Sequence, residues 1–378
     1  MNRAWVEVSL DAISHNIGLV KATLNPDVLI MAAVKADAYG HGAPDVARLM
    51  LQSGVDVLGV ACPDEAYQLR KAGITSPIVS LGYFPIESAT DIVAHDITPA
   101  VFDFSMAKAI SNAGLRLGKT SKIHIKVDTG MSRIGLQYNE AVDTILDIAK
   151  MPNIEIEGIF SHLACADDEN DAFSSLQFKR FTDVITNLSN HGLNPPLKHI
   201  ANSAATIKYP HMHLDMVRLG IINFGFYPHF PGLKPAMQLK TVISQIKHVP
   251  AGTPISYGST YVTKNPAIIA TLPIGYADGY SRRLSNKAFV LVGGKKVPVV
   301  GKICMDQCMI DVTNVNHLSI GDEVVLFGTD GENSIPVEEV AAWADTINYE
   351  ILSIIGRRVP RVYTRSGAVM RVKNYLDT

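Results

Sequence analysis

The chain has 378 residues, of which 47% are hydrophobic and 19% are charged. This length excludes a small disulfide-stabilised scaffold, and this balance of apolar and charged residues excludes an intrinsically disordered chain. The 34 lysines and arginines against 36 aspartates and glutamates give a formal net charge of −2, so a small molecule is a more natural partner than nucleic acid or an anionic membrane.

Strand and helix patterns alternate through the first half of the chain. After a strand at 5–9, short runs rich in β-branched residues alternate with amphipathic stretches such as 42–54, 140–150 and 173–192. This alternation is typical of βα units around a parallel sheet, and about eight strands predict a closed (β/α)8 TIM-type barrel. A doubly wound open sheet would produce the same local pattern. The predicted barrel strands are 28–34, 57–61, 77–82, 98–102, 122–128, 154–162, 197–203 and 216–221.

A different pattern begins after about residue 235, where closely spaced strands follow one another. Gly293 and Gly294 predict a tight turn in this region, and one helix is expected at 337–355. We therefore divide the chain into a barrel at 10–232 and a mainly β domain at 233–378, with which the N-terminal strand at 1–9 is a candidate to pair. The predicted strands of this domain are 237–249, 267–273, 289–300, 309–312, 323–327 and 359–363.

The beginning of the chain and its cysteines predict a cytoplasmic protein. The first residues, MNRAWVEVSLDAISHN, mix charged with apolar side chains and lack the apolar core of a secretory signal. Apolar runs such as 28–34 fall far short of the ~20 residues that a membrane-spanning helix requires. The four cysteines form no C-x-x-C pair, so we expect free thiols and assign no metal site.

Lys35 is the first candidate catalytic residue, because barrel enzymes place such residues at the carboxyl ends of their strands. It ends the first barrel strand within AAVKADAYGHG, at 32–42. The small apolar neighbours would desolvate its ammonium group and lower its pKa, as a lysine that forms a Schiff base requires. From its position alone, a surface lysine just after a strand is the simpler interpretation.

The loops after the seventh and eighth predicted strands are candidates to bind a phosphate group. In barrel enzymes these loops often supply backbone N–H groups and a hydroxyl to phosphate. Ser203, Gly220 and Ile221 lie there, although each also fits an ordinary role as a helix cap or a glycine turn. The ends of the sixth, seventh and eighth strands also carry His162, Asn202 and Arg218.

Three further segments have the composition of binding loops. Arg133 follows the fifth strand within KVDTGMSRIG, at 126–135, where its planar fork is suited to a carboxylate. Arginines after glycine loops are also common on surfaces. In the β domain, LPIGYADGY at 272–280 and GKICMDQCMIDVT at 301–313 are rich in turns, so they either reach another active site or form plain hairpins.

Taken together, eight segments in chain order resemble the alanine racemases. This resemblance spans nearly the whole chain, and the segment around Lys35 is its most specific part. It implies a barrel that binds pyridoxal 5'-phosphate, a β domain, and a head-to-tail homodimer that interconverts L-alanine and D-alanine. The matching segments are AAVKADAYGHG, KVDTGMSRIG, FSHLACAD, ANSAAT, VRLGIINFG, LPIGYADGY, GKICMDQ and PRVYTR.

The resemblance also implies two bases, one for each face of the substrate carbon. Lys35 binds the cofactor as an imine and serves the D-isomer, and Tyr276 of the partner subunit serves the L-isomer. Arg218 faces the pyridine nitrogen and, because a guanidinium can only donate, leaves that nitrogen unprotonated, which limits side reactions such as transamination.

The remaining implied contacts concern the phosphate, the ring and the substrate carboxylate. The carboxylate is bound by Arg133 and by the backbone N–H of Met305 of the partner subunit. His162 supports Arg218 and the ring, and Asn202 belongs to the same cofactor site. The phosphate is held by Tyr39, Ser203, Gly220, Ile221 and Tyr363.

Several features remain open at this level. Lys126 matches a lysine that some family members carbamylate, and an unmodified Lys126 beside Arg133 needs either a bound anion or Asp128 to balance its charge. Asp37 stands where many members have asparagine, and the role of Asp306 is uncertain.

Three other functions compete with an alanine racemase. An amino-acid racemase of broader specificity is the nearest alternative, and a non-catalytic pyridoxal phosphate carrier is further away because it needs no second base. A decarboxylase typically sets an acidic residue, not an arginine, against the pyridine nitrogen. D-alanine made by a racemase would supply peptidoglycan, or the enzyme would act in alanine catabolism.

Overall fold

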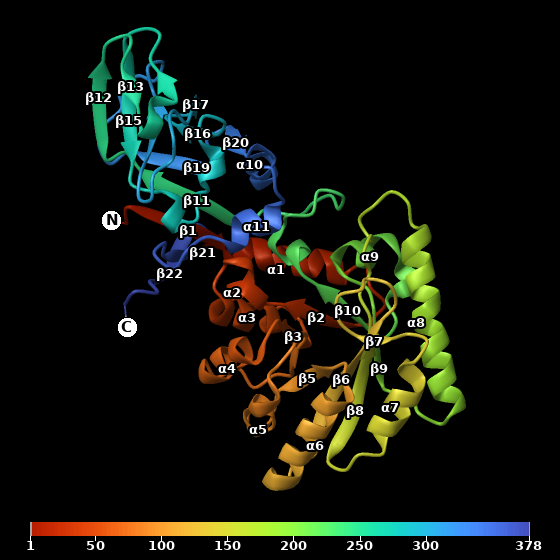
Figure 1. Ribbon diagram of the computed structural model, residues 1–378. Coiled ribbons are helices and arrows are strands. Elements are labelled where there is room, and N and C mark those ends of the chain that lie inside the picture. Colours follow the sequence, from red (N-terminus) through yellow and green to blue (C-terminus); the bar gives the residue numbers. More distant parts are fainter. Residues whose placement is uncertain (1, 378) are drawn as a thin grey trace.

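The computed structural model describes residues 2–377 as two packed parts. Figure 1 shows a barrel of strands and helices in the lower right and a mainly β part in the upper left, with both chain ends beside the β part. Among the described residues, no helix is both long and apolar enough to cross a bilayer.

Eight parallel strands form the barrel, in the order β10-β2-β3-β4-β5-β6-β8-β9, with the short β7 (Leu136–Gln137) beside β6. Two backbone hydrogen bonds close it between β9 and β10: Asp215 N to Lys198 O at 3.1 Å and Arg218 N to Ala201 O at 2.9 Å. The predicted barrel is therefore confirmed. Its strands are β2 (Leu29–Ala33), β3 (Val57–Val60), β4 (Ile78–Ser80), β5 (Thr98–Val101), β6 (Ser121–Asp128), β8 (Ile154–Phe160), β9 (Leu197–His199) and β10 (Met216–Leu219).

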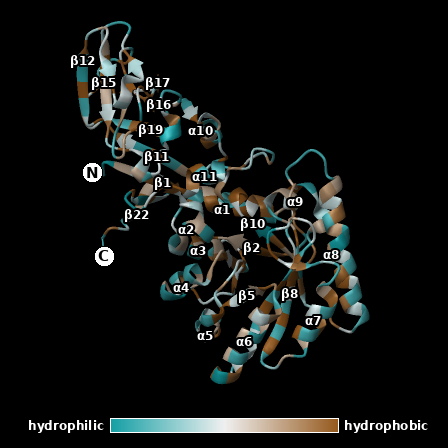
Figure 2. Cartoon of the chain, in the orientation of Figure 1, coloured by the Kyte–Doolittle hydropathy of each residue, from teal (hydrophilic) through white to brown (hydrophobic). Residues whose placement is uncertain are grey.

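Helices cover the outside of the barrel because one face of each is apolar. Figure 2 shows teal residues along α6 and α8, which have water on one side, and brown strands within the barrel. Asp103 accepts the N–H of Ser105 at 2.7 Å and caps α6, and Gly118 ends it with a left-handed φ of 63°. The outer helices are α1 (Leu10–Lys21), α3 (Ala43–Gln52), α4 (Pro63–Lys71), α5 (Ala89–Ala94), α6 (Phe104–Leu117), α7 (Ala141–Ala149), α8 (Ala172–Asn190) and α9 (Ser203–Lys208).

The β part is built on one large sheet in the order β17-β16-β19-β11-β1-β21-β22. The first strand, β1 (Ala4–Ser9), is antiparallel to β11 and parallel to β21, so the N-terminal strand pairs with the second half of the chain as expected. Its other members are β11 (Met237–Val242), β16 (Phe289–Val292), β17 (Lys295–Pro298), β19 (Glu323–Asp330), β21 (Arg361–Arg365) and β22 (Ala368–Lys373), with β20 (Asn333–Ile335) paired to β19.

A second, three-stranded sheet packs in the same part, in the order β12 (Gln245–Val249), β15 (Ala267–Leu272) and β18 (Cys308–Asp311). Three elements differ from their predictions. The strand expected at 289–300 is a hairpin, in which β16 and β17 pair antiparallel on either side of Gly293 and Gly294. The strand expected at 237–249 breaks into β11 and β12, which belong to different sheets. The helix expected at 337–355 breaks into α10 (Val337–Ala344) and α11 (Asn348–Ser353), because Asp345 adopts a left-handed φ of 56°.

The second helix of that pair joins the two parts of the molecule. It packs so closely on the turn after β2 that a Cβ built on Gly40 would lie 2.3 Å from the carbonyl oxygen of Leu352. Arg361 of β21 donates from Nε to the carbonyl of the same Gly40 at 2.8 Å. The β part therefore contributes directly to the carboxyl end of the barrel.

Candidate active site

A cavity of about 340 Å³ lies at the carboxyl ends of the barrel strands, where barrel enzymes place their sites. Four of its lining side chains are basic and only one, Asp167, is acidic, so it suits an anionic ligand. The basic residues are Lys35, Lys126, Arg133 and Arg218.

The turn that carries Lys35 has an uncommon backbone. Lys35 begins α2 (Lys35–Tyr39), and each left-handed residue of an L-chain costs roughly 1–2 kcal/mol. This turn brings both its first and its last side chain to the cavity. The left-handed residues are Ala36, Asp37, Ala38 and Tyr39, with φ of 51°, 53°, 54° and 54°.

Hydrogen bonds from other elements hold this turn. Glu65 accepts the N–H of Ala36 with one oxygen and the N–H of Ala61 with the other, each at 2.7 Å, and so ties the ends of two strands together. Asp37 accepts the N–H of Ala43 at 2.8 Å and the hydroxyl of Tyr375. The carboxylate of Asp37 therefore fixes the turn to the C-terminal segment.

Tyr363 supports this turn from behind and does not line the cavity. It is 1% exposed, and its hydroxyl donates to the carbonyl of His41 at 3.1 Å. A second tyrosine of the C-terminal half takes the place at the cavity wall: Tyr349 of α11, whose ring centroid lies 6.0 Å from that of Tyr39.

Burial and like charges prepare Lys35 for imine chemistry. Its pKa is lowered from the ordinary lysine value, first by desolvation and then by the positive charge of Arg133, while Glu65 opposes this shift. A larger fraction of the amine is therefore neutral and nucleophilic near neutral pH than in a free lysine.

Arg218 lies fully buried below the cavity and donates to every partner that it contacts. It bonds His199 Nδ1 at 2.8 Å, His162 Nδ1 at 3.1 Å, and the carbonyls of Ser161 and Ile200 at 2.8 and 3.0 Å. Burial, and then Arg133, lower its pKa to about 9, so the guanidinium stays protonated at neutral pH.

A chain of imidazoles extends from Arg218 to the surface. Since Arg218 cannot accept, His199 must accept at Nδ1 and donate from Nε2 to His124, 2.9 Å away. His124 then donates from Nε2 to Glu157 at 3.3 Å, and Glu157 pairs with the ammonium group of Lys122 at 2.6 Å. Burial lowers the pKa of both imidazoles, so both are neutral and each tautomer is fixed.

The opposite end of the cavity forms a cradle of donors. Ser203 Oγ accepts the N–H of Gly220 at 2.9 Å, and Asn202 caps the following helix by accepting the N–H of Ala205 at 3.0 Å. A Cβ on Gly220 would lie 2.7 Å from the hydroxyl of Tyr39 and 3.7 Å from Ser203 Oγ. A larger residue would displace the Tyr39 hydroxyl from this space, which is bordered by hydroxyls and backbone N–H groups that suit a phosphate.

Arg133 and Lys126 form the third side of the cavity. Asp128 Oδ1 accepts the N–H groups of Gly130 and Ser132, at 2.9 and 3.1 Å, and so shapes the loop that presents Arg133. Burial, Arg218 and Arg133 lower the pKa of Lys126 well below its ordinary value, which favours its neutral amine.

Tyr276 and Met305 lie elsewhere. Among the residues that the structure describes around this cavity, neither is present, and their side chains are 42% and 52% exposed. Their two loops are joined by backbone hydrogen bonds from Tyr276 N to Cys304 O at 3.1 Å and from Ala277 N to Met305 O at 3.0 Å. One unit of the β part therefore presents both side chains outward.

The structure thus gathers most of the residues singled out from the sequence, but not all of them. Tyr363, Tyr276 and Met305 are outside the cavity, and Tyr349, Tyr227 and Asp167 line it without having been singled out. In the sequence, Tyr349 is marked only by its place in a helix that ends shortly before the PRVYTR segment. Its contact with the turn after β2 depends on tertiary packing, which the sequence pattern does not show. The predicted residues that line the cavity are Lys35, Tyr39, Arg133, His162, Asn202, Ser203, Arg218, Gly220 and Ile221.

Comparison with known proteins finds relatives over nearly the whole chain. Residues 8–228 match the family model for the N-terminal domain of alanine racemase, and residues 236–363 match the model for its C-terminal domain. The alanine racemase of Methanococcus maripaludis is 47% identical over 366 residues, which are 95% of this chain and 98% of that protein.

Solved structures give the same result for the fold. The alanine racemase of Clostridium difficile 630 has a TM-score of 0.94 and 40% identity, and the match covers 100% of this chain and 99% of that chain. The alanine racemase from Bartonella henselae with covalently bound pyridoxal phosphate has a TM-score of 0.87 and 31% identity over 96% of this chain and 100% of that chain.

Proposed function

The chain belongs to the alanine racemase family, and from this premise we infer that it interconverts L-alanine and D-alanine with pyridoxal 5'-phosphate. The observation that carries this function is the basic cavity, in which a lysine of lowered pKa and a buried arginine face a cradle of hydroxyl and N–H donors.

We propose that this cradle holds the phosphate of the cofactor and that Lys35 binds its carbonyl carbon. Tyr39, Ser203, Gly220 and Ile221 surround the phosphate, and the close approach at Gly220 supports this assignment. When bound, the cofactor withdraws electrons from the bond between Cα and its hydrogen, so that a protein base can remove the α-proton.

Arg218 has the role of a donor that cannot lose its proton under working conditions. Four fixed contacts hold the guanidinium, and its partner His199 is locked as an acceptor by the imidazole chain behind it. A pyridine nitrogen placed against Arg218 would receive a hydrogen bond without receiving a proton. We propose that this arrangement favours return of the proton to the substrate Cα over side reactions such as transamination.

Racemisation requires a base on each face of the substrate carbon, and the chain supplies one of them within its own cavity. We propose that Lys35 moves the proton on the face that corresponds to D-alanine. Tyr276 would act on the opposite face from the partner subunit, in a homodimer with shared sites. Its exposure and its absence from the described lining of its own cavity support this assignment.

The substrate is held by its carboxylate. We propose that Arg133 binds this group, together with the backbone N–H of Met305 of the partner subunit. Tyr349, rather than Tyr363, is then the aromatic wall that restricts the substrate to a short side chain, because it is the tyrosine of the C-terminal half that lines the cavity.

Two further assignments are proposed with this function. The barrel is assigned to 10–232 and the β domain to 233–378 with the N-terminal strand, and the family matches at 8–228 and 236–363 support this division. A cytoplasmic location stays a prediction, supported by four free thiols.

Exchange of the α-proton in deuterated water tests the two-base scheme. The enantiomers have equal free energies, so steady-state racemisation cannot assign a base to one isomer, whereas exchange can. We expect Tyr276→Phe to lose racemisation and exchange of L-alanine by roughly 10²-fold or more while Lys35 still exchanges D-alanine. Equal losses for both isomers would contradict the scheme, and absorbance of bound cofactor without any exchange in the wild type would indicate a carrier.

A further inference from the structure

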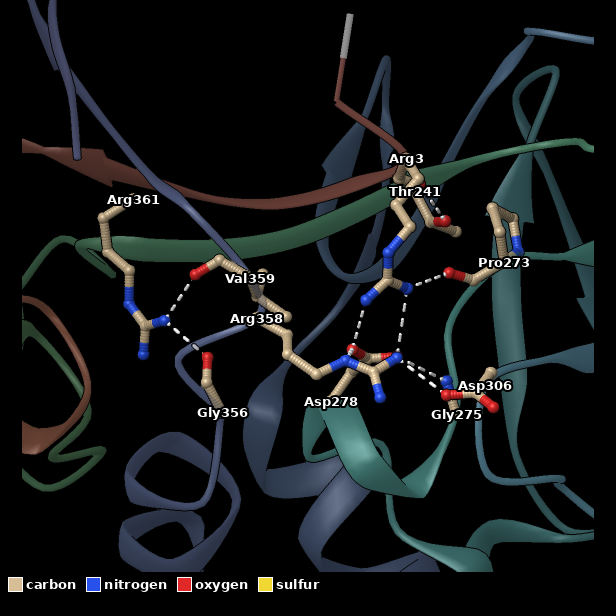
Figure 3. A network of polar contacts seen from close by, with 10 residues as sticks. All are labelled: Arg3, Thr241, Pro273, Gly275, Asp278, Asp306, Gly356, Arg358, Val359 and Arg361. Carbon is tan, nitrogen blue, oxygen red and sulfur yellow. Dashed lines mark hydrogen bonds and ion pairs between the residues drawn. The ribbon is translucent and has the colours of Figure 1, made fainter. Parts of the chain in front are cut away.

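A buried carboxylate lies directly behind the loop that presents Tyr276. Asp278 ends the short helix Tyr276–Asp278, and its side chain is 0% exposed. Figure 3 shows Arg3 and Arg358 converging on it from different elements. Arg3 contacts both of its oxygens, at 2.5 and 3.1 Å, and Arg358 Nε lies 3.2 Å from Oδ1.

The same two arginines also form hydrogen bonds with residues beside the Tyr276 and Met305 loops. Arg3 donates to the carbonyl of Pro273, which precedes the Tyr276 loop, at 2.5 Å. Arg358 donates to Asp306, the residue after Met305, at 2.7 Å. Asp278 therefore joins an N-terminal residue, both loops and the segment after α11 in one network (Figure 3).

The backbone of the Tyr276 loop is fixed by this carboxylate as well. Asp278 Oδ2 accepts the N–H of Gly275 at 3.0 Å, and the carbonyl of Asp278 accepts the N–H of Gly356 at 2.9 Å. A Cβ on Gly275 would lie 2.3 Å from the carbonyl oxygen of Cys304, so the two loops are in van der Waals contact. These contacts fix the backbone of the loop at both of its ends.

The phenol itself has no such support. Within residues 2–377, no hydrogen-bond partner is found for the Tyr276 hydroxyl, and the side chain projects from the surface. Its position is therefore set by its backbone, and its backbone is set by the ends of the loop. Misplacement of a reacting group by about 1 Å can cost roughly 10²-fold in rate.

We propose that Asp278, held between Arg3 and Arg358, is a positioning residue for the second base. This inference rests on the proposed role of Tyr276 and adds to it. The ion pairs fix the angle at which each protomer presents its phenol to the neighbouring site. Asp278 touches neither substrate nor cofactor.

The test uses the holoenzyme carrying Asp278→Asn. An asparagine keeps the volume but removes the charge that orients both guanidinium groups, and these are 38% and 37% exposed and can turn to water. We expect racemisation and exchange of L-alanine to fall by about 10- to 100-fold, while exchange of D-alanine stays within about threefold. Cofactor absorbance and dimer mass remain those of the wild type.

A matched control breaks an ion pair of the same domain away from both loops. Lys240 Nζ lies 3.0 Å from Glu323 and 3.1 Å from Glu7, so Glu323→Gln removes one charge from a more exposed ion-pair network of the same domain. This control should keep the wild-type ratio of L-alanine to D-alanine exchange. If Asp278→Asn does not yield folded protein, Arg3→Gln removes only one of the two ion pairs to Asp278. It should lower the ratio of L-alanine to D-alanine exchange in the same direction by a smaller factor.

Tyr276→Phe, measured in parallel, separates this inference from the function on which it rests. If Tyr276→Phe affects both isomers equally, the proposed second base is wrong. If Tyr276→Phe is selective for L-alanine but Asp278→Asn and Arg3→Gln keep the wild-type exchange ratio, or lose both isomers equally, only the positioning role is overturned.

Discussion

At the scale of single residues, the cavity is lined by basic groups whose pKa values are lowered by burial and by the positive charges of their neighbours. Burial lowers the pKa of Lys35, Lys126, Arg218 and His162, and each of these shifts is increased by neighbouring positive charge. Anionic ligands relieve this repulsion. The same positive charges that would attract a phosphate and a carboxylate therefore also favour the neutral amines of the two lysines.

Lys126 is the residue for which this environment predicts a modification. A neutral amine can add carbon dioxide with the loss of one N–H proton to solvent, and the negative charge of the resulting carbamate would be stabilised by the positive charges of Arg218 and Arg133. We expect labelled bicarbonate to give a carbamate signal in 13C NMR that is lost in Lys126→Gln. We also expect Lys126→Gln to raise KM for alanine roughly tenfold, since Arg133 loses a charged partner. The carbamate would be contradicted if the wild type showed no 13C carbamate signal and Lys126→Gln left KM for alanine unchanged.

Glu157 predicts a pH dependence of stability. Hydrogen bonds from His124 and Lys122 lower its pKa to about 2, below the ordinary value of 4.5. The unfolded chain therefore binds the proton more strongly, and ~1–3 kcal/mol of stability that is present above pH 4.5 is lost as the pH falls toward 2. Glu157→Gln should move the acid-unfolding midpoint, followed by circular dichroism, to higher pH. Glu155→Gln on the same strand, where the side chain is exposed, should leave it in place.

At the scale of elements, the left-handed turn after β2 depends on α11. Gly40 and Gly73 both have a φ of +81°, but a Cβ at Gly40 would meet the backbone of α11 and a Cβ at Gly73 would meet no atom within 4 Å. We expect Gly73→Ala to cost ~1 kcal/mol for its φ alone. Gly40→Ala should cost ~1–3 kcal/mol more and reduce cofactor binding, because α11 must move away from Lys35 and Tyr39.

Thermal unfolding and cofactor absorbance measure this difference. We expect a clearly lower Tm and weaker cofactor absorbance in Gly40→Ala than in Gly73→Ala. Equal Tm values in the two variants would show that α11 does not press on the lysine turn.

The eight barrel strands and the lysine motif were predictable because their information is local. β-Branched runs mark buried parallel strands, and the order of the motifs indicates the family. The break between α10 and α11 was not predictable, since the helical pattern runs through Asp345 and only tertiary packing turns it. Tyr349 was missed for this reason, and Tyr363, which belongs to a recognisable segment, was placed in the cavity although its side chain lies behind the turn.

At the scale of the whole molecule, each chain carries the two proposed proton carriers, Lys35 and Tyr276, in different places. Lys35 lies in the basic cavity of the barrel, whereas Tyr276 is presented outward by the β domain. The sequence resemblance implied this separation, but no local pattern could indicate it, because exposure of a side chain depends on the packing of both domains. A head-to-tail dimer would bring each phenol to the cavity of the other chain.

The central claim is that one active site takes its lysine from one chain and its tyrosine from another, and subunit complementation tests it most directly. Lys35→Ala and Tyr276→Phe, each inactive alone, are given different affinity tags, mixed in equal amounts and allowed to exchange subunits. A mixed dimer has one site with both bases intact, so random exchange should restore about one quarter of the wild-type racemase activity per chain. Mixed dimers that are isolated through both tags and show no racemase activity would contradict the shared site.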